Sequence, residues 1–182
     1  MKGASIKTLY LIRHAKSDWK DPTTSDFERG LTKRGRKDLN TMGSYLKLRG
    51  IVPDLVIASC SLRTQITADA IADKVGFEGQ RDYLQELYLT SPETLKETLM
   101  LQENTFNTIM VVGHNPQMTE VVNMMVDEHI TKMPTLGIVA INFDIDEWSQ
   151  LEDAQGEIDF FIFPKQFKYY MPKQIRAVLN RS

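Results

Sequence analysis

The stretch Thr8-Leu-Tyr-Leu-Ile-Arg-His14 is a continuous apolar run that ends in two basic side chains. Such a run, without a helical period, is typical of a strand that is buried on both faces of a parallel sheet. Two further apolar runs lie at residues 55–58 and 109–112, and they are followed by Arg63 and His114. Ligands bind at the carboxyl ends of the strands in an open α/β sheet. The sequence therefore predicts an anion pocket of Arg and His side chains at one sheet edge.

Helical patterns separate these strands. The first predicted helix begins after the N-cap Thr32 and ends at Gly50, which suits the position after a helix C-terminus. The second follows a turn at residues 59–61 and ends at Gly76. Its apolar positions are Leu62, Ile66, Ala70 and Val75.

Two more helices are predicted from their first residues. Ser91-Pro92 is typical of an N-cap followed by proline at the first helical position. Asn115 and Pro116 repeat this pattern after the third buried strand. That assignment places His114 at the N-terminus of a helix.

The remaining segments complete an α/β order. A weaker strand is expected at residues 82–84, and strands at residues 136–143 and 158–163 are joined by an acidic turn region that indicates a hairpin. The polar segment 18–30 is expected to form a loop near the end of the first strand and a wall of the site. We expect βα units followed by a β ribbon, in one domain that spans residues 1–182.

Charge and composition exclude several classes of partner. The formal net charge of −2 provides no basic footprint, so we expect no nucleic-acid partner. The first apolar run stops at Arg13, which is too short for a signal peptide or a membrane span, so we expect a cytoplasmic protein without membrane contact. Cys60 is the single cysteine, and we expect a buried or half-buried thiol.

The basic residues at the strand ends suit phosphoryl transfer. This chemistry needs donors for three oxygens, a nucleophile in line, and usually a proton for the leaving group. Arg13 and Arg63 suit the oxygens, because guanidinium groups pair with phosphate in a bidentate way. A neutral imidazole is a competent nucleophile when its other nitrogen donates to a carbonyl or carboxylate, and His14 is the candidate. His114 would donate to a phosphate oxygen. The four residues predict a phosphohistidine intermediate.

No metal site is predicted. The three histidines, His14, His114 and His129, show neither HxH nor HExxH spacing, and there is no cysteine cluster. We expect His129 to be a solvated loop residue. Neither a metal nor an organic cofactor is expected.

Three motifs resemble those of the histidine phosphatase superfamily. Leu11-Ile-Arg-His-Ala-Lys-Ser17 is similar to its RHG signature, with Ala15 in place of glycine as in the SixA-like phosphohistidine phosphatase branch. Ser59-Cys-Ser-Leu-Arg-Thr-Gln-Ile-Thr-Ala68 resembles the SSPxxR-TA turn, although Cys60 replaces the usual proline. Val112-Gly-His-Asn-Pro116 matches the second histidine motif.

The resemblance extends over nearly the whole chain, since Leu31-Thr-Lys-Arg-Gly35 resembles the PLTxxG helix start and Pro134-Thr135 with Trp148 resemble the family's tail. It implies a phosphoglycerate-mutase-like α/β fold, a single-domain three-layer α/β/α sandwich with a mostly parallel central sheet and helices on both faces. It also implies site roles for matching residues. His14 would be the nucleophile, Ser17 would add a hydroxyl contact, and the phosphate would be surrounded by Arg13, Arg63 and His114.

The proton donor stays open at this point. Leu84-Gln-Glu86 resembles the position where mutase-like members keep an acidic donor, and Asp18 in the loop is the alternative. Either carboxyl would need a raised pKa, and a merely solvated or helix-capping Glu86 is equally expected. A phosphohistidine substrate depends less on a proton donor, because a ring-protonated imidazole leaves more easily than an alkoxide.

The leading hypothesis is a metal-independent phosphatase for phosphohistidine on a protein, such as a histidine-phosphotransfer domain. The chain is short, and its only sizeable loops are residues 18–30 and the hairpin region, so we expect an uncapped pocket that admits a phosphorylated protein side chain. The alternatives are a phosphatase for small phosphoesters, a mutase, which would need a lid to retain its intermediate, and a non-catalytic phospho-ligand-binding protein.

Overall fold

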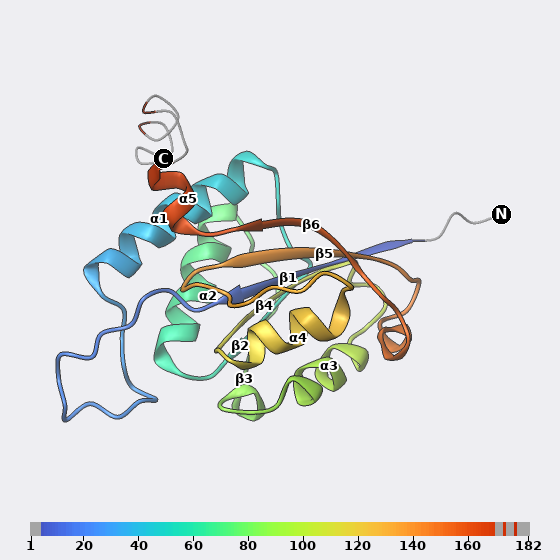
Figure 1. Ribbon diagram of the computed structural model, residues 1–182, viewed down its shortest axis with the longest axis horizontal. Helices are drawn as coiled ribbons and strands as arrows, with labels where there is room; N and C mark the ends of the chain where they lie inside the picture. The colour runs from blue at the N-terminus through green and yellow to red at the C-terminus, as the bar shows by residue number, and fades with distance from the viewer. Residues whose placement is uncertain (1–4, 170–172, 174–176, 178–182) are drawn as a thin grey trace.

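Six strands form one mixed sheet in the order β3-β2-β4-β1-β5-β6 (Figure 1). The computed structural model describes residues 5–169, Lys173 and Ala177. The strands β1 to β4 run parallel, and β5 runs against both of its neighbours, β1 and β6. The mostly parallel sheet and the terminal hairpin are therefore confirmed. The strands are β1 (Ile6–Arg13), β2 (Leu55–Ser59), β3 (Arg81–Leu84), β4 (Thr108–Gly113), β5 (Ile138–Asp144) and β6 (Glu157–Ile162).

Two helices, α1 and α3, begin after residues whose side chains accept hydrogen bonds from the first turn. The Thr32 side chain accepts a hydrogen bond from the Gly35 N–H, and Ser91 caps the Thr94 N–H in the same way. Both N-caps agree with the prediction. The described helices are α1 (Lys33–Leu48), α2 (Leu62–Val75), α3 (Pro92–Met100), α4 (Gln117–Met125) and α5 (Pro164–Tyr169), with two short 3₁₀ helices, η1 (Gln85–Leu87) and η2 (Trp148–Glu152).

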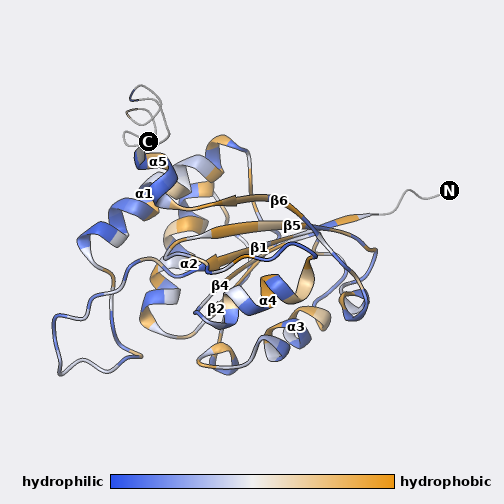
Figure 2. Cartoon of the chain, in the orientation of Figure 1, coloured by the Kyte–Doolittle hydropathy of each residue, from blue (hydrophilic) through white to orange (hydrophobic). Residues whose placement is uncertain are grey.

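The sheet separates two apolar cores. Successive side chains of a strand point to opposite faces, so Tyr10 and Ile12 of β1 join the core beneath α1 and α2, whereas Leu9 and Leu11 join the core beneath α3 and α4. Figure 2 shows largely hydrophobic strands between helices in which hydrophilic and hydrophobic residues alternate. Burial on both faces explains why β1 reads as an unbroken apolar run rather than an alternating one.

The parallel strands bring the motif residues to one edge. The register pairs Arg13 at the end of β1 with Gly113 at the end of β4, and Ala58 of β2 with Val112 of β4. The segments that follow these strands therefore leave the sheet side by side. This is the crevice in which open α/β sheets bind ligands.

Helix α2 buries part of the face that its apolar spacing predicts, since Val75 is buried and Ile66 and Ala70 pack against the core, but its first turn differs from the prediction. Leu62 is 42% exposed, whereas Arg63 and Thr67 are buried. The Thr67 hydroxyl accepts a hydrogen bond from the Ala15 N–H at 3.0 Å and donates to the Arg63 carbonyl at 2.7 Å. The first turns of α2 thus face the end of β1 with polar side chains.

Helix α4 begins one residue later than predicted. Pro116 is the N-cap, and Asn115 does not cap the helix. Instead the Asn115 amide donates to the Met133 carbonyl at 2.9 Å and accepts from the Thr119 hydroxyl at 3.1 Å. The side chain therefore ties the start of α4 to a neighbouring segment, which competes with capping.

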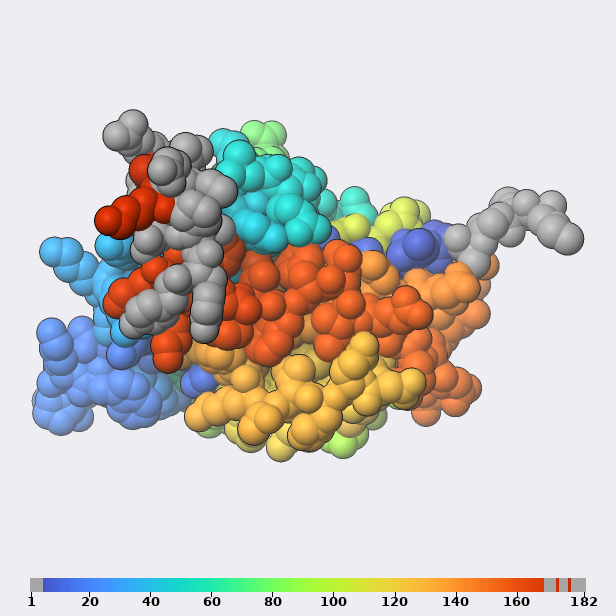
Figure 3. Space-filling model, turned by 45° about the horizontal axis from the view of Figure 1, so that its top comes forward, coloured from blue at the N-terminus to red at the C-terminus, as the bar shows by residue number. Residues whose placement is uncertain are grey.

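Segment 18–30 forms the predicted loop over the end of β1. Its base is closed by a hydrogen bond from the Asp18 N–H to the Gly30 carbonyl at 2.9 Å. In the space-filling view the loop projects at one end of the molecule, beside the start of α1 (Figure 3). Within the described residues, we find no helix with the length and hydropathy that a membrane span requires.

Candidate active site

A cavity of about 650 Å³ lies at the carboxyl edge of the sheet. The predicted residues Arg13, His14, Ser17, Arg63 and His114 all line it. Loop 18–30 supplies one wall, as expected. The other residues that line the cavity are Lys16, Trp19, Asp26, Arg29, Arg34, Leu89, Asn115 and Thr135. Five of the lining residues are Arg or Lys and one, Asp26, is acidic, so the cavity suits an anion.

His14 is held as a neutral imidazole. Its Nδ1 lies 2.7 Å from the Ala15 carbonyl oxygen, which can only accept, so Nδ1 carries the proton and Nε2 keeps the lone pair. The pKa of His14 is lowered to about 4, chiefly by burial; the Ala15 hydrogen bond opposes this, and the charges of Arg63 and Arg13 add to it. At neutral pH the side chain is therefore uncharged, which is the state that its predicted role as nucleophile requires.

His114 lies beside His14, with ring centroids 5.4 Å apart. A guanidinium can only donate, so the 3.3 Å contact with Arg63 makes the His114 Nδ1 an acceptor. The Nε2–H then donates to the Ser59 hydroxyl at 2.8 Å. Burial, followed by the charge of Arg63, lowers the pKa of His114 to about 3. In this state both ring nitrogens have protein partners, and donation to a phosphate oxygen stays a prediction.

Arg63 is held by a loop carboxylate that sequence reasoning did not single out. The Asp26 carboxylate lies 3.0 Å from a terminal nitrogen of Arg63, whose side chain is almost fully buried. The Tyr88 hydroxyl also donates to Asp26, at 2.6 Å. Burial raises the pKa of Asp26, but the hydrogen bonds from Tyr88, Arg29 and Arg63 outweigh it, so the pKa lies well below its usual value. Asp26 is thus ionised and forms ion pairs with Arg29 and Arg63.

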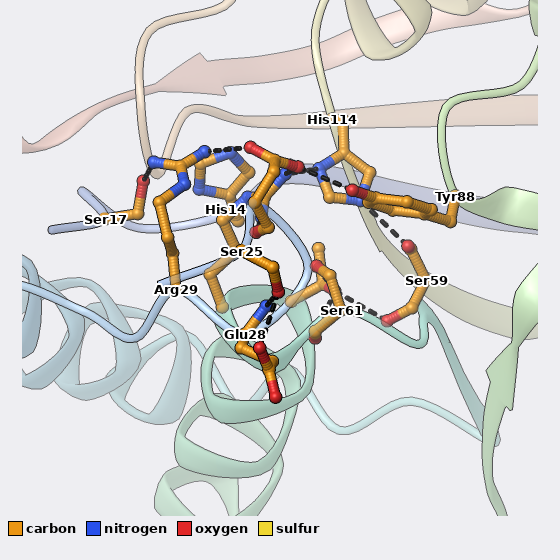
Figure 4. A network of polar contacts seen from close by, with 12 residues as sticks. His14, Ser17, Ser25, Glu28, Arg29, Ser59, Ser61, Tyr88 and His114 are labelled. Carbon is orange, nitrogen blue, oxygen red and sulfur yellow. Dashed lines mark hydrogen bonds and ion pairs between the residues drawn. The ribbon is translucent and has the colours of Figure 1, made fainter. Parts of the chain in front are cut away.

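Arg29 is a third guanidinium in the cavity, also missed from the sequence. It donates to the Ser17 hydroxyl at 2.8 Å and forms an ion pair with Asp26 (Figure 4). The ring of Trp19 covers it, with the guanidinium carbon 3.3 Å from the ring centroid. In this state the Ser17 hydroxyl therefore accepts a hydrogen bond from Arg29. Its contact with phosphate stays a prediction.

Three arginines of the cavity have an N–H group without a hydrogen-bond acceptor among the described residues. Arg13 donates to the Met133 carbonyl at 3.0 Å through a terminal nitrogen. The Nε–H groups of Arg13, Arg29 and Arg63 are buried, and the described residues supply no acceptor for them. Buried donors are almost always satisfied, so three such groups around one cavity indicate an anionic ligand with several oxygens.

The predicted proton donors lie away from this cluster. Glu86 is exposed on η1 and does not line the cavity. Asp18 does not line it either, and its carboxylate accepts from the Lys20 N–H at 3.0 Å. The residues next to Glu86 do reach the site, since Tyr88 contacts Asp26 and Leu89 lines the cavity.

Two other predictions concern residues outside the site. Cys60 is half-buried, as predicted, and lies 2.9 Å from the Gln85 side-chain oxygen. His129 is exposed, which agrees with a loop residue. Among the described residues, no group of three or more His, Cys, Asp or Glu side chains is arranged to hold a metal ion.

The missed residues carried only a weak sequence signal. Asp26 and Arg29 lie in a loop that was predicted to form a site wall, but a polar loop contains many charged residues, and no periodicity tells which of them point inward. Tyr88 follows a short 3₁₀ helix and is linked to the site by its hydrogen bond to Asp26, which is 62 residues away in sequence.

Comparisons with known proteins place the fold and motifs in one family. Residues 9–105 match the model of the histidine phosphatase superfamily (branch 1). A protein of Mycobacterium tuberculosis is 26% identical over 164 residues, which cover 85% of this chain and all of that protein. One of the solved structures that carry the name phosphohistidine phosphatase SixA, from Agrobacterium tumefaciens, has a TM-score of 0.75 at 25% identity, over 86% of this chain and 97% of that one.

A more distant structure shows the shared fold. Phosphoglycerate mutase from Bacillus anthracis has a TM-score of 0.58 at 14% identity, over 82% of this chain and 97% of that one. The mixed sheet with helices on both faces is therefore the phosphoglycerate-mutase-like fold that the motifs imply. With the family model covering more than half of its residues, the chain belongs to the histidine phosphatase superfamily (branch 1), in its SixA-like branch.

Proposed function

We propose that this protein is a metal-independent phosphatase that removes the phosphoryl group from phosphohistidine on a protein, through a covalent phosphohistidine intermediate on His14. The observation that carries the proposal is the neutral His14 in a cavity that Arg13, Arg29 and Arg63 also line. Its Nδ1–H is fixed by the Ala15 carbonyl, which leaves the Nε2 lone pair for attack.

The first half of the reaction transfers the phosphoryl group. Arg13, Arg29 and Arg63 bind its oxygens, partly through the Nε–H groups that have no described acceptor. The His14 Nε2 attacks phosphorus in line, and the bond between phosphorus and the substrate imidazole breaks. The electron pair of that bond stays on the departing ring nitrogen.

The second half releases the product. A water molecule attacks phosphorus on His14, the bond to Nε2 breaks, and its electron pair returns to the imidazole. The water's proton goes to the departing phosphate. Histidine and inorganic phosphate are then the products, and the starting state of His14 is restored.

The lack of a suitable proton donor among the described lining residues supports a phosphoramidate substrate. Asp26 is the one carboxylate among the described lining residues, and its lowered pKa makes it a poor proton donor. An alkoxide leaving group would need such a donor, whereas a ring-protonated imidazole leaves as a neutral molecule. The names of the SixA-like relatives support the same substrate class.

The test compares a phosphohistidine-bearing phosphotransfer domain with para-nitrophenyl phosphate, using wild-type protein and His14→Ala for both. We expect fast release of phosphate from the phosphoprotein, slow release from the ester, and none with the variant. The reverse preference would assign the protein to small phosphoesters and make Glu86→Gln the next variant to test. Phosphoprotein binding without turnover would identify a non-catalytic phospho-ligand-binding protein.

A further inference from the structure

Two large apolar side chains stand exposed at the mouth of the charged cavity. Trp19 is 73% exposed and Leu89 is 70% exposed, and both line the cavity that contains His14. They come from different segments, loop 18–30 and the residues after η1. Other exposed apolar residues, such as Leu101 at 85%, do not line this cavity.

Leu89 occupies a backbone conformation that leucine seldom adopts. Its φ is +52°, in the left-handed region that favours glycine or asparagine. Such a residue persists only where its surroundings over-determine it, and these positions gather at functional sites. Burial does not account for a leucine here, because most of the side chain is exposed. The side chain therefore suits a contact that a bound molecule would complete.

The two segments are joined rather than independent. The rings of Phe27 and Tyr88 pack edge to face with centroids 5.2 Å apart, and the Tyr88 hydroxyl donates to Asp26. One face of the Trp19 ring packs against the Arg29 guanidinium. The contacts hold both segments in place before any substrate arrives, so the apolar side chains at the mouth are preorganised.

We propose that Trp19 and Leu89 form a docking rim that contacts the apolar surface of the carrier protein next to its phosphorylated imidazole. The proposal rests on the proposed function and names the residues that would distinguish a protein substrate from a small one. A phosphoryl group that reaches His14 from a protein brings the surface of that protein to the cavity mouth, where these two side chains lie. A small polyol phosphate has no apolar surface to place there.

The test separates contact with the carrier from phosphate chemistry. Leu89→Asn removes the apolar surface and keeps a residue that tolerates the left-handed conformation. The matched control is Leu101→Asn, at an exposed position outside the cavity. Each protein is assayed with a phosphohistidine-bearing phosphotransfer domain and with phosphoramidate, which carries no ring or protein. Circular dichroism and thermal unfolding verify that the variants are folded.

We expect Leu89→Asn to lower kcat/KM for the phosphotransfer domain by about tenfold, mainly through KM, because a lost apolar contact has about this effect on discrimination. Turnover of phosphoramidate should stay within about twofold of wild type. Leu101→Asn should change neither. Trp19→Ala should reduce turnover of the phosphotransfer domain more than turnover of phosphoramidate.

The outcomes keep the two proposals apart. If wild-type protein hydrolyses the phosphotransfer domain and Leu89→Asn does so equally well, the docking rim is wrong and the proposed function stands. Equal losses on both substrates would place Leu89 in the phosphate site and also overturn the rim. If wild-type protein hydrolyses phosphoramidate but not the phosphotransfer domain, the proposed protein substrate is wrong, and the rim with it.

Discussion

Asp26 and Arg63 form an ion pair inside a cavity that is built for an anion. The carboxylate oxygen lies 3.0 Å from a terminal nitrogen of Arg63, and the same carboxylate also binds Arg29 and accepts from Tyr88. A loop residue thus orients two guanidinium groups that come from different parts of the chain. Because the pKa of Asp26 is lowered, the carboxylate keeps its charge at neutral pH.

Replacing this carboxylate should disorder the arginines. We expect Asp26→Ala to lower kcat/KM for phosphoramidate by about tenfold to a hundredfold, since charge-assisted hydrogen bonds contribute about 1.5–3 kcal/mol each and part of that orients Arg63 and Arg29. Tyr88→Phe, which removes one contact to Asp26, should have a smaller effect. A higher kcat/KM in Asp26→Ala would instead show that the carboxylate competes with phosphate.

His14→Ala should abolish turnover and leave the fold intact. The imidazole is the candidate nucleophile. Its removal takes away one recorded hydrogen bond, to the Ala15 carbonyl, and the ring contact with His114. Rapid acid quench of the wild-type reaction with labelled phosphotransfer domain should trap an acid-labile phosphoryl group on the enzyme, and the variant should trap none. Retained turnover by the variant would refute the nucleophile assignment.

The two site histidines should make stability depend on pH. Burial lowers the pKa of His14 to about 4 and of His114 to about 3 from an ordinary value of 6.5. Below about pH 6.5 the unfolded chain binds protons that the folded chain does not, so the folded state loses stability as the pH falls. The expected loss is about 1.4 kcal/mol per pH unit and per histidine until the folded-state pKa is reached.

Urea unfolding at pH 7, 6 and 5 measures this slope. The matched variant is His114→Gln, which keeps an amide able to bond with Ser59 or Arg63 and cannot titrate. Its slope should be shallower than that of the wild-type protein. An identical slope in both proteins would mean that His114 does not have a lowered pKa.

Trp19 should report anion binding at Arg29. Its ring stacks on that guanidinium and is largely exposed, whereas the other tryptophan, Trp148, is fully buried and lies outside the cavity. Tungstate, a phosphate-like oxyanion, should therefore change the fluorescence of Trp19 in a saturable way. The change should disappear in Trp19→Phe and weaken strongly in Arg29→Ala. A signal that survives in Trp19→Phe would come from elsewhere in the protein.

Local chain chemistry sets most of the fold. The unbroken apolar run in β1 indicates a strand covered on both faces, and Thr32 and Ser91 cap their helices as their sequence contexts predict. The parallel arrangement then brings Arg13, His14 and His114 to one edge, because strand ends in such a sheet share a side. These residues could be predicted, since Arg13 ends β1 and His14 and His114 directly follow β1 and β4.

Two details show where local patterns are insufficient. The apolar residues of α2 predict Leu62 on the inner face, yet the helix buries Arg63 and Thr67, because their partners lie at the end of β1 and in loop 18–30. Glu86 was a candidate proton donor because its neighbours resemble a family motif, with a solvated side chain as the equal alternative; the 3₁₀ helix leaves it exposed, and Tyr88 contacts Asp26 instead.

Hydrophobic periodicity and the residues at strand ends are enough to predict most of the strands and helices, the sheet edge that holds the cavity, and the candidate nucleophile His14 with Arg13 beside it, because these features depend only on neighbours in the chain. The places of Arg29 and Asp26 in the cavity, and of Tyr88 behind Asp26, depend on tertiary contacts. Their ion pairs and hydrogen bonds join a loop to segments up to 62 residues away, and such contacts leave no periodic trace in the chain.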